Sequence, residues 1–349
     1  MKILIIILLL FNFNIINAQE EITTKIISDS YIRIMFYNVE NLFDTKNDSI
    51  KNDDEFLPTN DKFWTSKKYY AKVNQISKVI AAIGKWNPPA IIGLCEIENR
   101  YALNSLVNYS SLKNLNYKII HKESPDFRGI DVALIYKENL FKVIFYKAIE
   151  INFPFSPEST TRDILYVKGT TKTKDTLHVF VNHWPSRWGG QMQSEERRMF
   201  VASVLKNTTD SIFITDKNAS IVIMGDFNDY PYNKSLTEVL KANREYSDIQ
   251  PDKLYNLSAY LQEASNLGTH KHEGKWGVLD QIIVSGSLLN TKNKTFTSKE
   301  NVHIFDADFL LVEDEAYSGK KPYRTYIGFR YIGGFSDHLP VYLDVFFND

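Results

Sequence analysis

The sequence predicts an α/β protein built from layers of sheet and helix, because apolar segments with strand character alternate with segments of helical periodicity. The first such strand covers residues 31–37, where Ile32, Ile34 and Phe36 occupy alternate positions and share one face. Most of the predicted strands end directly in polar residues. With 44% hydrophobic and 24% charged residues, the composition is ordinary for a globular protein and leaves ample material for a core.

The first predicted helix covers residues 66–84. Val73 and Ile76 recur on one stripe at helical spacing, and Gly84 is a common type of helix stop. A second helix is expected over residues 194–205. Neither the pattern nor the composition decides whether the strands form one sheet or two. The remaining strands are expected over residues 90–95, 131–136, 165–168, 177–182, 221–225, 279–285 and 341–347.

Residues 1–18 have the features of a signal peptide. Lys2 supplies a positive start, residues 3–11 form an unbroken apolar run, and residues 16–18 resemble a cleavage site. The apolar run is shorter than the roughly 20 residues that a spanning helix needs, so we expect no integral membrane span. The alternative is a retained N-terminal anchor. We therefore expect an exported protein, either periplasmic or extracellular.

Beyond residues 1–18 we expect a short leader over residues 19–30 and one domain over residues 31–349, because no linker, low-complexity tract or repeat divides the chain. Cys95 is the only cysteine, so no intrachain disulfide can form. The formal net charge is −1, and removing the positive Lys2 with the signal peptide makes it −2. A nearly neutral chain has no global attraction for nucleic acid, which would need a local basic patch or a metal.

Side chains able to bind metal or transfer protons gather where the predicted strands end. Polar groups at such positions lie at the rim of a sheet, where loops build active sites. Taken alone each signal is weak, because the segment at Asp226 is typical of a turn and Glu96 is also a suitable helix cap. Their recurrence after one strand after another favours an active site. The set is Asn38, Glu40, Glu96, His183, Asp226, Asn228, Asp280, Asp337 and His338.

In this order the set resembles the endonuclease/exonuclease/phosphatase family, the deoxyribonuclease I-like hydrolases, over about residues 33–345. The most specific pieces are Gly-Asp-Phe-Asn at 225–228 and Ser-Asp-His-Leu-Pro-Val at 336–341. Residues 37–44 and 182–187 look most like secreted bacterial members. The resemblance implies a four-layer α-β-β-α sandwich, with two packed mixed sheets flanked by helices, as the catalytic domain.

The resemblance also implies a metal site. Glu96 matches the principal metal carboxylate of the family, and Asn38 lies beside it. Glu40 and Asp337 are then the expected additional ligands, for this ion or for a second one. Mg²⁺ prefers about six hard oxygen ligands and keeps several waters, so one or two carboxylates are enough to hold it. We expect Mg²⁺, with Mn²⁺ as a substitute, in one or two copies.

The remaining members of the set take catalytic roles by resemblance. Asp226 and Asn228 match the pair that orients the attacking water and holds the scissile phosphate. His338 matches the terminal catalytic histidine, Asp280 its carboxylate partner, and His183 the second histidine of deoxyribonuclease-like members. Either Asp226 or the Asp280–His338 pair takes the proton of the water, and the sequence leaves both open.

Three residues outside the set are candidate substrate contacts. Asp131 opens a predicted strand, and it either orients His183 or is simply the first residue of that strand. Arg128 and Arg187 either contact phosphate or belong to the solvated surface.

The segment 316–336 contains no acidic residue and interleaves basic with aromatic side chains. Such a mixture suits a groove for a nucleic-acid backbone with stacked bases, in which Arg324 and Arg330 would contact substrate. The alternative is a hairpin whose aromatic residues pack on the sheet. Trp184 and Trp188 have the same two interpretations.

Five further histidines are given no catalytic role. His121, His178 and His303 lie in or beside apolar strands and are most simply packing or surface residues. His270 and His272 belong either to a loop that faces the substrate or to the plain surface.

The leading functional hypothesis is a secreted, metal-dependent phosphoester hydrolase, most simply an endonuclease that cleaves DNA or RNA by attack of water. The alternative is a hydrolase of phospholipid or inositol-phosphate head groups, for which residues 153–155 are the one candidate apolar hairpin. A catalytically inactive binding module is disfavoured, because every matched position keeps its functional residue. We expect a nucleic-acid substrate and a monomer.

Overall fold

The computed structural model describes residues 30–187, 189–264 and 267–348. The predicted signal peptide (1–18) and, apart from Ser30, the predicted leader (19–30) lie outside the described residues, as does Trp188. Within the described part of the chain, no helix is long and apolar enough to cross a membrane.

The described strands form two large sheets of seven strands each, and both mix parallel with antiparallel pairs. In the first sheet the order is β14-β20-β1-β2-β4-β3, and β15 also pairs with β20. Its strands are β1 (Tyr31–Leu42), β2 (Ile91–Ile97), β3 (Lys118–His121), β4 (Asp131–Tyr136), β14 (Thr295–Phe296), β15 (Val302–Ile304) and β20 (Val341–Phe347). Strand β1 is parallel to β2 and antiparallel to β20, so the sheet joins the two ends of the domain.

The second sheet has the order β5-β6-β7-β8-β13-β10-β9. Its strands are β5 (Phe141–Ile149), β6 (Ile164–Thr171), β7 (Thr176–His183), β8 (Ser220–Asp226), β9 (Ala242–Asn243), β10 (Leu254–Asn256) and β13 (Asp280–Ser285). Strands β7 and β8 are parallel, whereas β13 runs antiparallel to β8.

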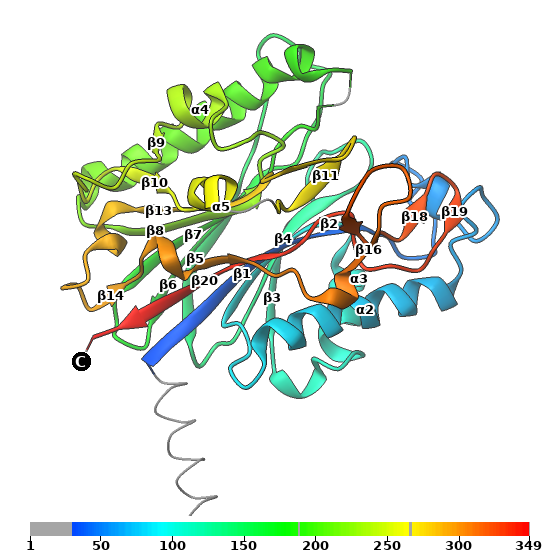
Figure 1. Cartoon of the computed structure of the whole chain (residues 1–349), viewed down its shortest axis with the longest axis horizontal. Helices are drawn as coiled ribbons and strands as arrows, with labels where there is room; N and C mark the ends of the chain where they lie inside the picture. Colours follow the sequence, from blue (N-terminus) through cyan, green and yellow to red (C-terminus); the bar gives the residue numbers. More distant parts are fainter. Residues whose placement is uncertain (1–29, 188, 265–266, 349) are drawn as a thin grey trace, which may run out of the picture.

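Helices cover the outer faces of both sheets (Figure 1). On the first sheet lie α2 (Ser66–Gly84) and α3 (Arg100–Asn108), and on the second lies α4 (Gln191–Thr215). Helix α5 (Ser258–Ala264) follows β10. The result is the α-β-β-α sandwich that the resemblance implied. Short helical turns occupy Asp54–Phe56, Lys113–Leu115, Ser235–Val239, Gly286–Leu289, Lys299–Asn301 and Asp308–Leu310.

The central core lies between the two sheets. Ile34 and Phe36 of β1 point into it, as their alternation predicted, and meet side chains of the second sheet such as Met224. A Cβ atom at Gly93 would lie 2.8 Å from Cε of Met224 and 3.1 Å from Cγ1 of Val181, so a larger residue there would require these side chains to shift. A second core lies between the first sheet and its helices, and a third lies between the second sheet and α4.

The structure extends several predicted elements. Helix α2 has the predicted bounds, but β1 continues to Leu42 and α4 is 25 residues long instead of ending at residue 205. Three small hairpins were not predicted, because two- or three-residue strands are too short to show an alternating pattern. They are β11 (His270–His272) with β12 (Lys275–Gly277), β16 (Leu311–Glu313) with β17 (Lys320–Pro322), and β18 (Tyr326–Ile327) with β19 (Arg330–Tyr331).

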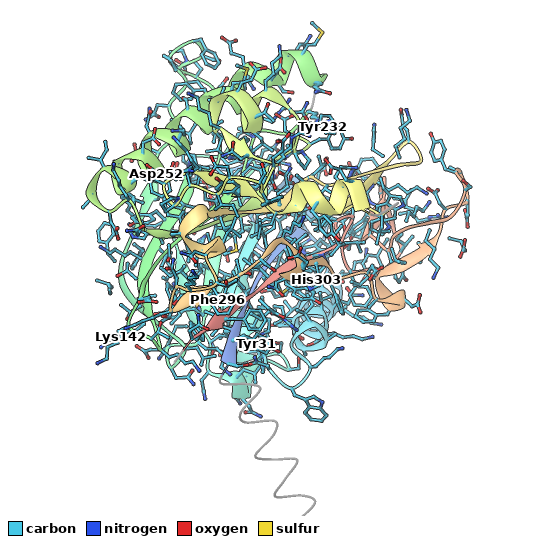
Figure 2. The ribbon with its side chains drawn as sticks, turned by 60° about the vertical axis from the view of Figure 1, so that its left-hand side comes forward. Tyr31, Lys142, Tyr232, Asp252, Phe296 and His303 are labelled. Carbon is cyan, nitrogen blue, oxygen red and sulfur yellow. The ribbon has the colours of Figure 1, made fainter. Side chains whose placement is uncertain are left out.

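The carboxyl ends of the central strands define the functional edge of the sandwich. Figure 2 shows Tyr31, at the amino end of β1, and Tyr232, in the loop after β8, on opposite sides of the molecule. Phe296 lies on the Tyr31 side, where it stacks on Phe346 with ring centroids 5.8 Å apart. Aromatic packing therefore closes one edge, and the loops after β1, β2, β7 and β8 occupy the other.

Candidate active site

The polar residues that follow the strands meet at one edge of the sandwich. Because β1 and β2 are parallel, Asn38 and Glu96 leave the first sheet at the same end. In the second sheet His183 of β7 is opposite Asp226 of β8, and Asp226 is opposite Asp280 of β13. The register of five strands thus brings together residues that are far apart in the sequence.

The backbone at this edge is bent out of ordinary strand geometry. Glu40, Asn41, Glu96 and Asn228 all have positive φ, between 51° and 61°. This left-handed conformation costs a non-glycine residue roughly 1–2 kcal/mol. The pairing of β1 with β2 also shifts register after Asn38. Strain of this kind at four positions of one edge is typical of a functional site, where bulges redirect side chains.

Asn38 connects the two sheets. Its Nδ2 donates to Oε1 of Glu96 at 3.2 Å and to Oδ2 of Asp226 at 3.1 Å. Nε2 of His183 lies 3.9 Å from the Glu96 carboxylate and 3.7 Å from that of Asp226. Asn228 lies beside them, with its backbone N–H donating to Asp226 and its Nδ2 donating to a neighbouring carbonyl. Two amides, one histidine and two carboxylates therefore share a small volume.

His338 is paired with Asp280 at the centre of the site. Nδ1 of His338 lies 2.7 Å from Oδ2 of Asp280, and both side chains are buried. Burial lowers the pKa of His338, but the Asp280 and Asp226 carboxylates outweigh it and hold that pKa well above its ordinary value. Nε2 of His338 lies 3.9 Å from Asp226. His338 is therefore a cation at neutral pH, with the Asp280 carboxylate fixing its orientation.

The other two titratable groups are shifted in opposite directions. Burial raises the pKa of Asp226 to about 6, although His338 partly offsets this effect. Burial, with help from the charges of Arg162 and Arg128, holds the pKa of His183 well below its ordinary value. The site thus combines a neutral histidine, a protonated histidine and a carboxylate that titrates close to neutral pH.

Glu40 and Asp337, the predicted additional metal ligands, are both engaged by Arg324. Its Nε lies 3.3 Å from Glu40, and its Nη2 donates to Asp337 at 3.0 Å. Glu40 also accepts from the backbone N–H of Thr325 at 2.6 Å and lies 3.7 Å from the buried ammonium of Lys72. The Glu40 carboxylate is therefore occupied by protein partners, whereas Asp337 keeps a partly exposed side chain beside His338.

Asp131 and Arg128 lie on the far side of β2 from these groups. Asp131 opens β4, and its carboxylate binds Nε2 of His121 at 3.0 Å and the backbone N–H of Ser124 at 2.8 Å. Nδ1 of His183 is buried without a hydrogen-bond partner among the described residues. The interpretation that Asp131 orients His183 is therefore wrong in this structure, because its oxygens face other groups. Arg128 is partly exposed and close enough to act on the pKa of His183.

The side chains of Arg187 and Arg330 lie outside the central group of site residues. Nε of Arg187 donates to the carbonyl of Asn228 at 2.7 Å, and its guanidinium stacks on Tyr230. These contacts of Arg187 stabilise the loop that follows β8. Arg330 lies in the exposed β18–β19 hairpin.

The aromatic residues of the segment 316–336 mostly pack inward. Tyr326 and Phe335 are buried in the core between the first sheet and α2, and Tyr323 and Tyr331 pack against it. The packing interpretation of this segment is confirmed for these four rings. Trp184 is also fully buried, where it packs on Phe227.

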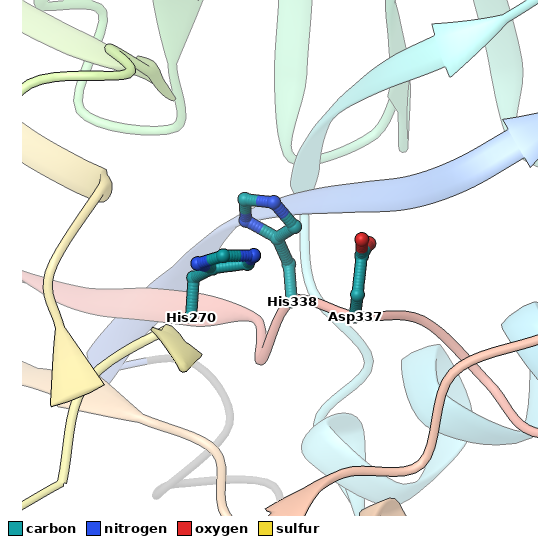
Figure 3. A group of neighbouring side chains, drawn as sticks. All are labelled: His270, Asp337 and His338. Atoms are coloured by element: carbon teal, nitrogen blue, oxygen red, sulfur yellow. The ribbon is translucent and has the colours of Figure 1, made fainter. Parts of the chain in front are cut away.

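His270 lies beside the site residues, in agreement with the first of the two interpretations that the sequence left open, a loop that faces the substrate. It lies in β11 and forms an isolated bridge with His338, with ring centroids 4.7 Å apart (Figure 3). Burial, followed by the charge of His338, lowers the pKa of His270 to about 3. The turn pair Glu273-Gly274 is a signal that could have predicted the hairpin. No local sequence pattern predicts that His270 contacts His338, because the two residues are far apart in the chain.

The three histidines expected in packing or surface roles have them. His121 binds Asp131, as described. His178 lies 2.7 Å from the hydroxyl of Tyr166, and His303 stacks on Tyr342 with centroids 5.0 Å apart.

The residues at this edge fit a divalent cation. Glu96 accepts from Asn38 and from the backbone N–H of Asn41 at 2.9 Å. Among the described ion pairs its only partner is His183, whose low pKa keeps it neutral. Asp337 offers a second carboxylate in a cluster with His270 and His338 whose ligand atoms lie within 4.8 Å of one another, but the protonated His338 cannot itself bind a metal. An uncompensated carboxylate beside a second carboxylate and amide oxygens is a donor set suited to a hard cation.

Comparison with known proteins agrees with this geometry. The family model described as "Endonuclease/Exonuclease/phosphatase family" matches residues 33–346. A search among curated proteins gave no match. Three solved structures share the fold. An endonuclease/exonuclease/phosphatase family protein from Bacteroides thetaiotaomicron has a TM-score of 0.56 at 15% identity and covers 91% of this chain and 98% of its own.

The other two have similar statistics. The catalytic domain of human Nocturnin has a TM-score of 0.54 at 17% identity and covers 91% of this chain and 95% of its own. A mannosyl-6-phosphatase from Bacteroides thetaiotaomicron has a TM-score of 0.55 at 15% identity and covers 90% of this chain and all of its own. At such identities the structures establish the fold, and the family model covers nearly all the described residues. The chain therefore belongs to the endonuclease/exonuclease/phosphatase family, whose members are divalent-metal-dependent phosphoester hydrolases.

Proposed function

We propose that the chain is a Mg²⁺-dependent endonuclease that cleaves phosphodiester bonds of DNA or RNA by direct attack of water. The observation that carries the proposal is the group formed by the Asp280–His338 pair, Asp226 and His183 around the Asn38–Glu96 contact. It offers a proton acceptor, a fixed cation and a site for metal within one small volume. Those are the three groups that hydrolysis of an anionic ester needs.

Asp226 is the proposed proton acceptor. A general base must be unprotonated and have a pKa near the working pH, and burial raises the pKa of Asp226 to about 6. His338 is unsuitable for that role, because it already holds a proton. The Asp280–His338 pair instead stabilises the charge that develops on the phosphate. This assigns different tasks to the two candidates that the sequence left open.

The amides and the metal hold the phosphate. Asn38 and Asn228 are neutral donors, which can bind a phosphate oxygen without trapping a proton. Glu96 is the proposed metal carboxylate, with Asp337 as the second ligand. The bound Mg²⁺ supplies Lewis-acid stabilisation of the phosphate oxygens. Because Glu40 is held by Arg324, Lys72 and Thr325, we assign it the role of positioning Arg324.

A lipid substrate has less support from the structure. In the candidate apolar stretch at residues 153–155, Phe153 is buried, and Phe155 is 42% exposed and makes an edge contact with Phe200 of α4. One partly exposed ring is little apolar surface for insertion into a bilayer.

Hydrolysis by the purified protein tests the proposal. The substrates would be plasmid DNA, single-stranded DNA, RNA, sphingomyelin, an inositol polyphosphate and bis-p-nitrophenyl phosphate, each with Mg²⁺ or Mn²⁺ and then with EDTA. Metal-dependent nicking of the plasmid, absent in His338→Ala, is expected. If a lipid or inositol phosphate is hydrolysed and the nucleic acids stay intact, the proposed metal-dependent hydrolysis stands, but the proposed nucleic-acid substrate is wrong. If none of the substrates is hydrolysed, a catalytically inactive binding module is favoured.

The proposal also includes export of the protein, with residues 1–18 as a cleaved signal peptide. Its support is the charged start, apolar run and small-residue cleavage site of residues 1–18. Expression of the full chain in a bacterial host should release a protein that begins at Gln19, as Edman sequencing would report. A start at Met1 in the membrane fraction would favour the retained anchor. Light scattering of the mature protein should give the mass of a monomer.

A further inference from the structure

A groove leads away from His183 between the loops that carry Arg128 and the start of α4. It combines a cleft of about 780 Å³ with an adjoining hollow of about 390 Å³. The two share the lining residues Asp126, Phe127, Thr160 and Arg197, so they form one continuous depression. This depression is far larger than a single phosphate or a sugar phosphate requires.

The inner end of the groove adjoins the active site. Arg162 lines it, and its Nε donates to the carbonyl of His183 at 3.2 Å. Nη2 of the same side chain donates to the carbonyl of Trp184 at 2.6 Å. Pro185 and Ser186, which follow directly, also line the cleft. A chain bound along the groove would therefore lie next to the segment that carries His183, although His183 and Asp226 do not themselves line the cleft.

Positive charge in the groove is only partly neutralised. Asp126 binds Arg162 at 3.0 Å, and its other oxygen accepts from the backbone N–H of Arg128. The Arg128 guanidinium lies 3.9 Å from Asp126 and is 43% exposed. Arg197 is exposed, and its described hydrogen bond is to the neutral hydroxyl of Ser159 at 3.2 Å. Glu55 and Glu158 also line the groove, and Glu55 is paired with Lys62 at 2.9 Å. Arg197 has no partner among the described ion pairs, so its guanidinium is the one most available to an anion, with the partly exposed Arg128 on the same groove.

An exposed aromatic ring lies between the two halves of the groove. Phe127 lines both of them and is 65% exposed. An exposed ring next to basic groups is the usual platform for an unpaired base, and its burial under a base removes apolar surface from water.

The alternative track, over the segment 316–336, lacks these properties. The pocket beside Arg324 has a volume of about 180 Å³. Its two cations are already paired, Lys62 with Glu55 at 2.9 Å and Arg324 with Glu40 at 3.3 Å. Of the six aromatic rings of that segment, Tyr326 and Phe335 lie in the core and two more pack against it, while Tyr317 and Phe329 are exposed.

We infer that the groove binds the nucleotide next to the scissile phosphate of a single-stranded nucleic acid. Arg128 and Arg197 contact its phosphates, and the base stacks on Phe127. The inference rests on the proposed nuclease function and deepens it, because it names the strand form and the path of the substrate. It also places the substrate track away from Arg330, one of the candidate contacts that the sequence offered.

The test compares a short single-stranded oligothymidylate with bis-p-nitrophenyl phosphate, a diester too small to fill the groove. The measured quantity is the ratio of kcat/KM for the two substrates. Arg197→Ala should lower this ratio about tenfold, as expected for one lost charge-assisted hydrogen bond. The salt dependence of log(kcat/KM) on the oligonucleotide should become shallower by about 0.7, the value for one phosphate contact on a single strand.

Two matched variants make the result specific. Arg244→Ala removes an exposed arginine that lines neither part of the groove, and its ratio should equal that of the wild type. Arg330→Ala tests the alternative track and should behave like Arg244→Ala. Phe127→Ala should lower the ratio about tenfold, and this loss should vanish on an oligonucleotide with abasic residues next to the scissile phosphate.

The possible failures are distinguishable. If the wild type cleaves the oligonucleotide and Arg197→Ala keeps its ratio and salt slope, the groove inference is wrong while the nuclease function stands. A loss confined to Arg330→Ala would place the track on the C-terminal segment and overturn the inference. If the wild type turns over only the small diester, the proposed nuclease function fails, and the groove inference fails with it.

Discussion

The two halves of the active site differ in what surrounds their charged groups. In the first-sheet half, Glu40 and Asp337 are bound to fixed cations, Arg324 and the buried Lys72. In the second-sheet half, Asp226 has no Lys or Arg partner among the described ion pairs and faces two histidines instead.

This difference separates two tasks. Arginine keeps its charge across the physiological pH range, so Arg324 gives the first-sheet half a permanent positive charge, whereas burial lowers the pKa of Lys72 and raises that of Glu40. In the second-sheet half, Asp226 is the group whose pKa of about 6 lies near neutral pH, because the pKa of His183 is held well below its ordinary value and that of His338 well above it. In the proposed mechanism, the first-sheet half positions groups and the second-sheet half transfers the proton. Glu96, between them, is the proposed metal carboxylate.

Loss of His338 should have the largest effect. His338→Ala should lower kcat on bis-p-nitrophenyl phosphate by about 10²–10⁴-fold, because the fixed cation of the proton-transfer half is lost. His303→Ala, a change at an exposed histidine far from the site, is the control. Steady-state kinetics at saturating metal checks this, and near-normal turnover would remove His338 from the mechanism.

Glu96→Gln should have the next largest effect, on metal affinity. The Mg²⁺ concentration for half-maximal activity should rise at least about tenfold, because the uncompensated carboxylate is lost while the side-chain shape is kept. Circular dichroism should show an unchanged fold. Glu138→Gln, at an exposed position, controls for the loss of one negative charge. An unchanged metal titration would exclude Glu96 as a ligand.

The third prediction concerns pH. Because burial raises the pKa of Asp226 to about 6, this carboxyl group should still titrate near pH 6 in the metal-free protein. It is protonated below that pH and unprotonated above it, so kcat/KM should fall as the pH drops through this range. Carboxyl-carbon NMR follows the titration, and Asp226→Asn assigns the signal. Titration at the ordinary value of an aspartate would show that the two halves do not differ in this way.

Glu40→Gln should have the smallest effect on catalysis. If Glu40 is a positioning residue, the metal titration should stay close to that of the wild type, in contrast to Glu96→Gln. The free energy of unfolding should fall by about 3 kcal/mol, because a buried ammonium at Lys72 loses its carboxylate partner. Urea unfolding measures this change in the free energy of unfolding. A shift in metal affinity as large as that of Glu96→Gln would make Glu40 a ligand after all.

Local patterns account for much of the fold. The alternation of Ile32, Ile34 and Phe36 predicted a strand and the face that packs between the sheets, and the helical spacing after Ser66 predicted α2 with its observed bounds. Both elements are long enough for periodicity to be visible. The hairpins β11–β12 and β18–β19 are not, so their positions came only from the structure.

The sequence by itself determined which chemical groups stand at the strand ends, because a polar residue after an apolar run must lie at the rim of a sheet. Its ordered set from Asn38 to His338 was sufficient to recognise the family. Only the tertiary structure decided what each group contacts. Glu40 meets Arg324, and Asp131 meets His121 instead of His183. His270 packs against His338. Such contacts join loops far apart in the chain, and their partners are set by sheet register and loop packing, which leave no periodic signal in the sequence.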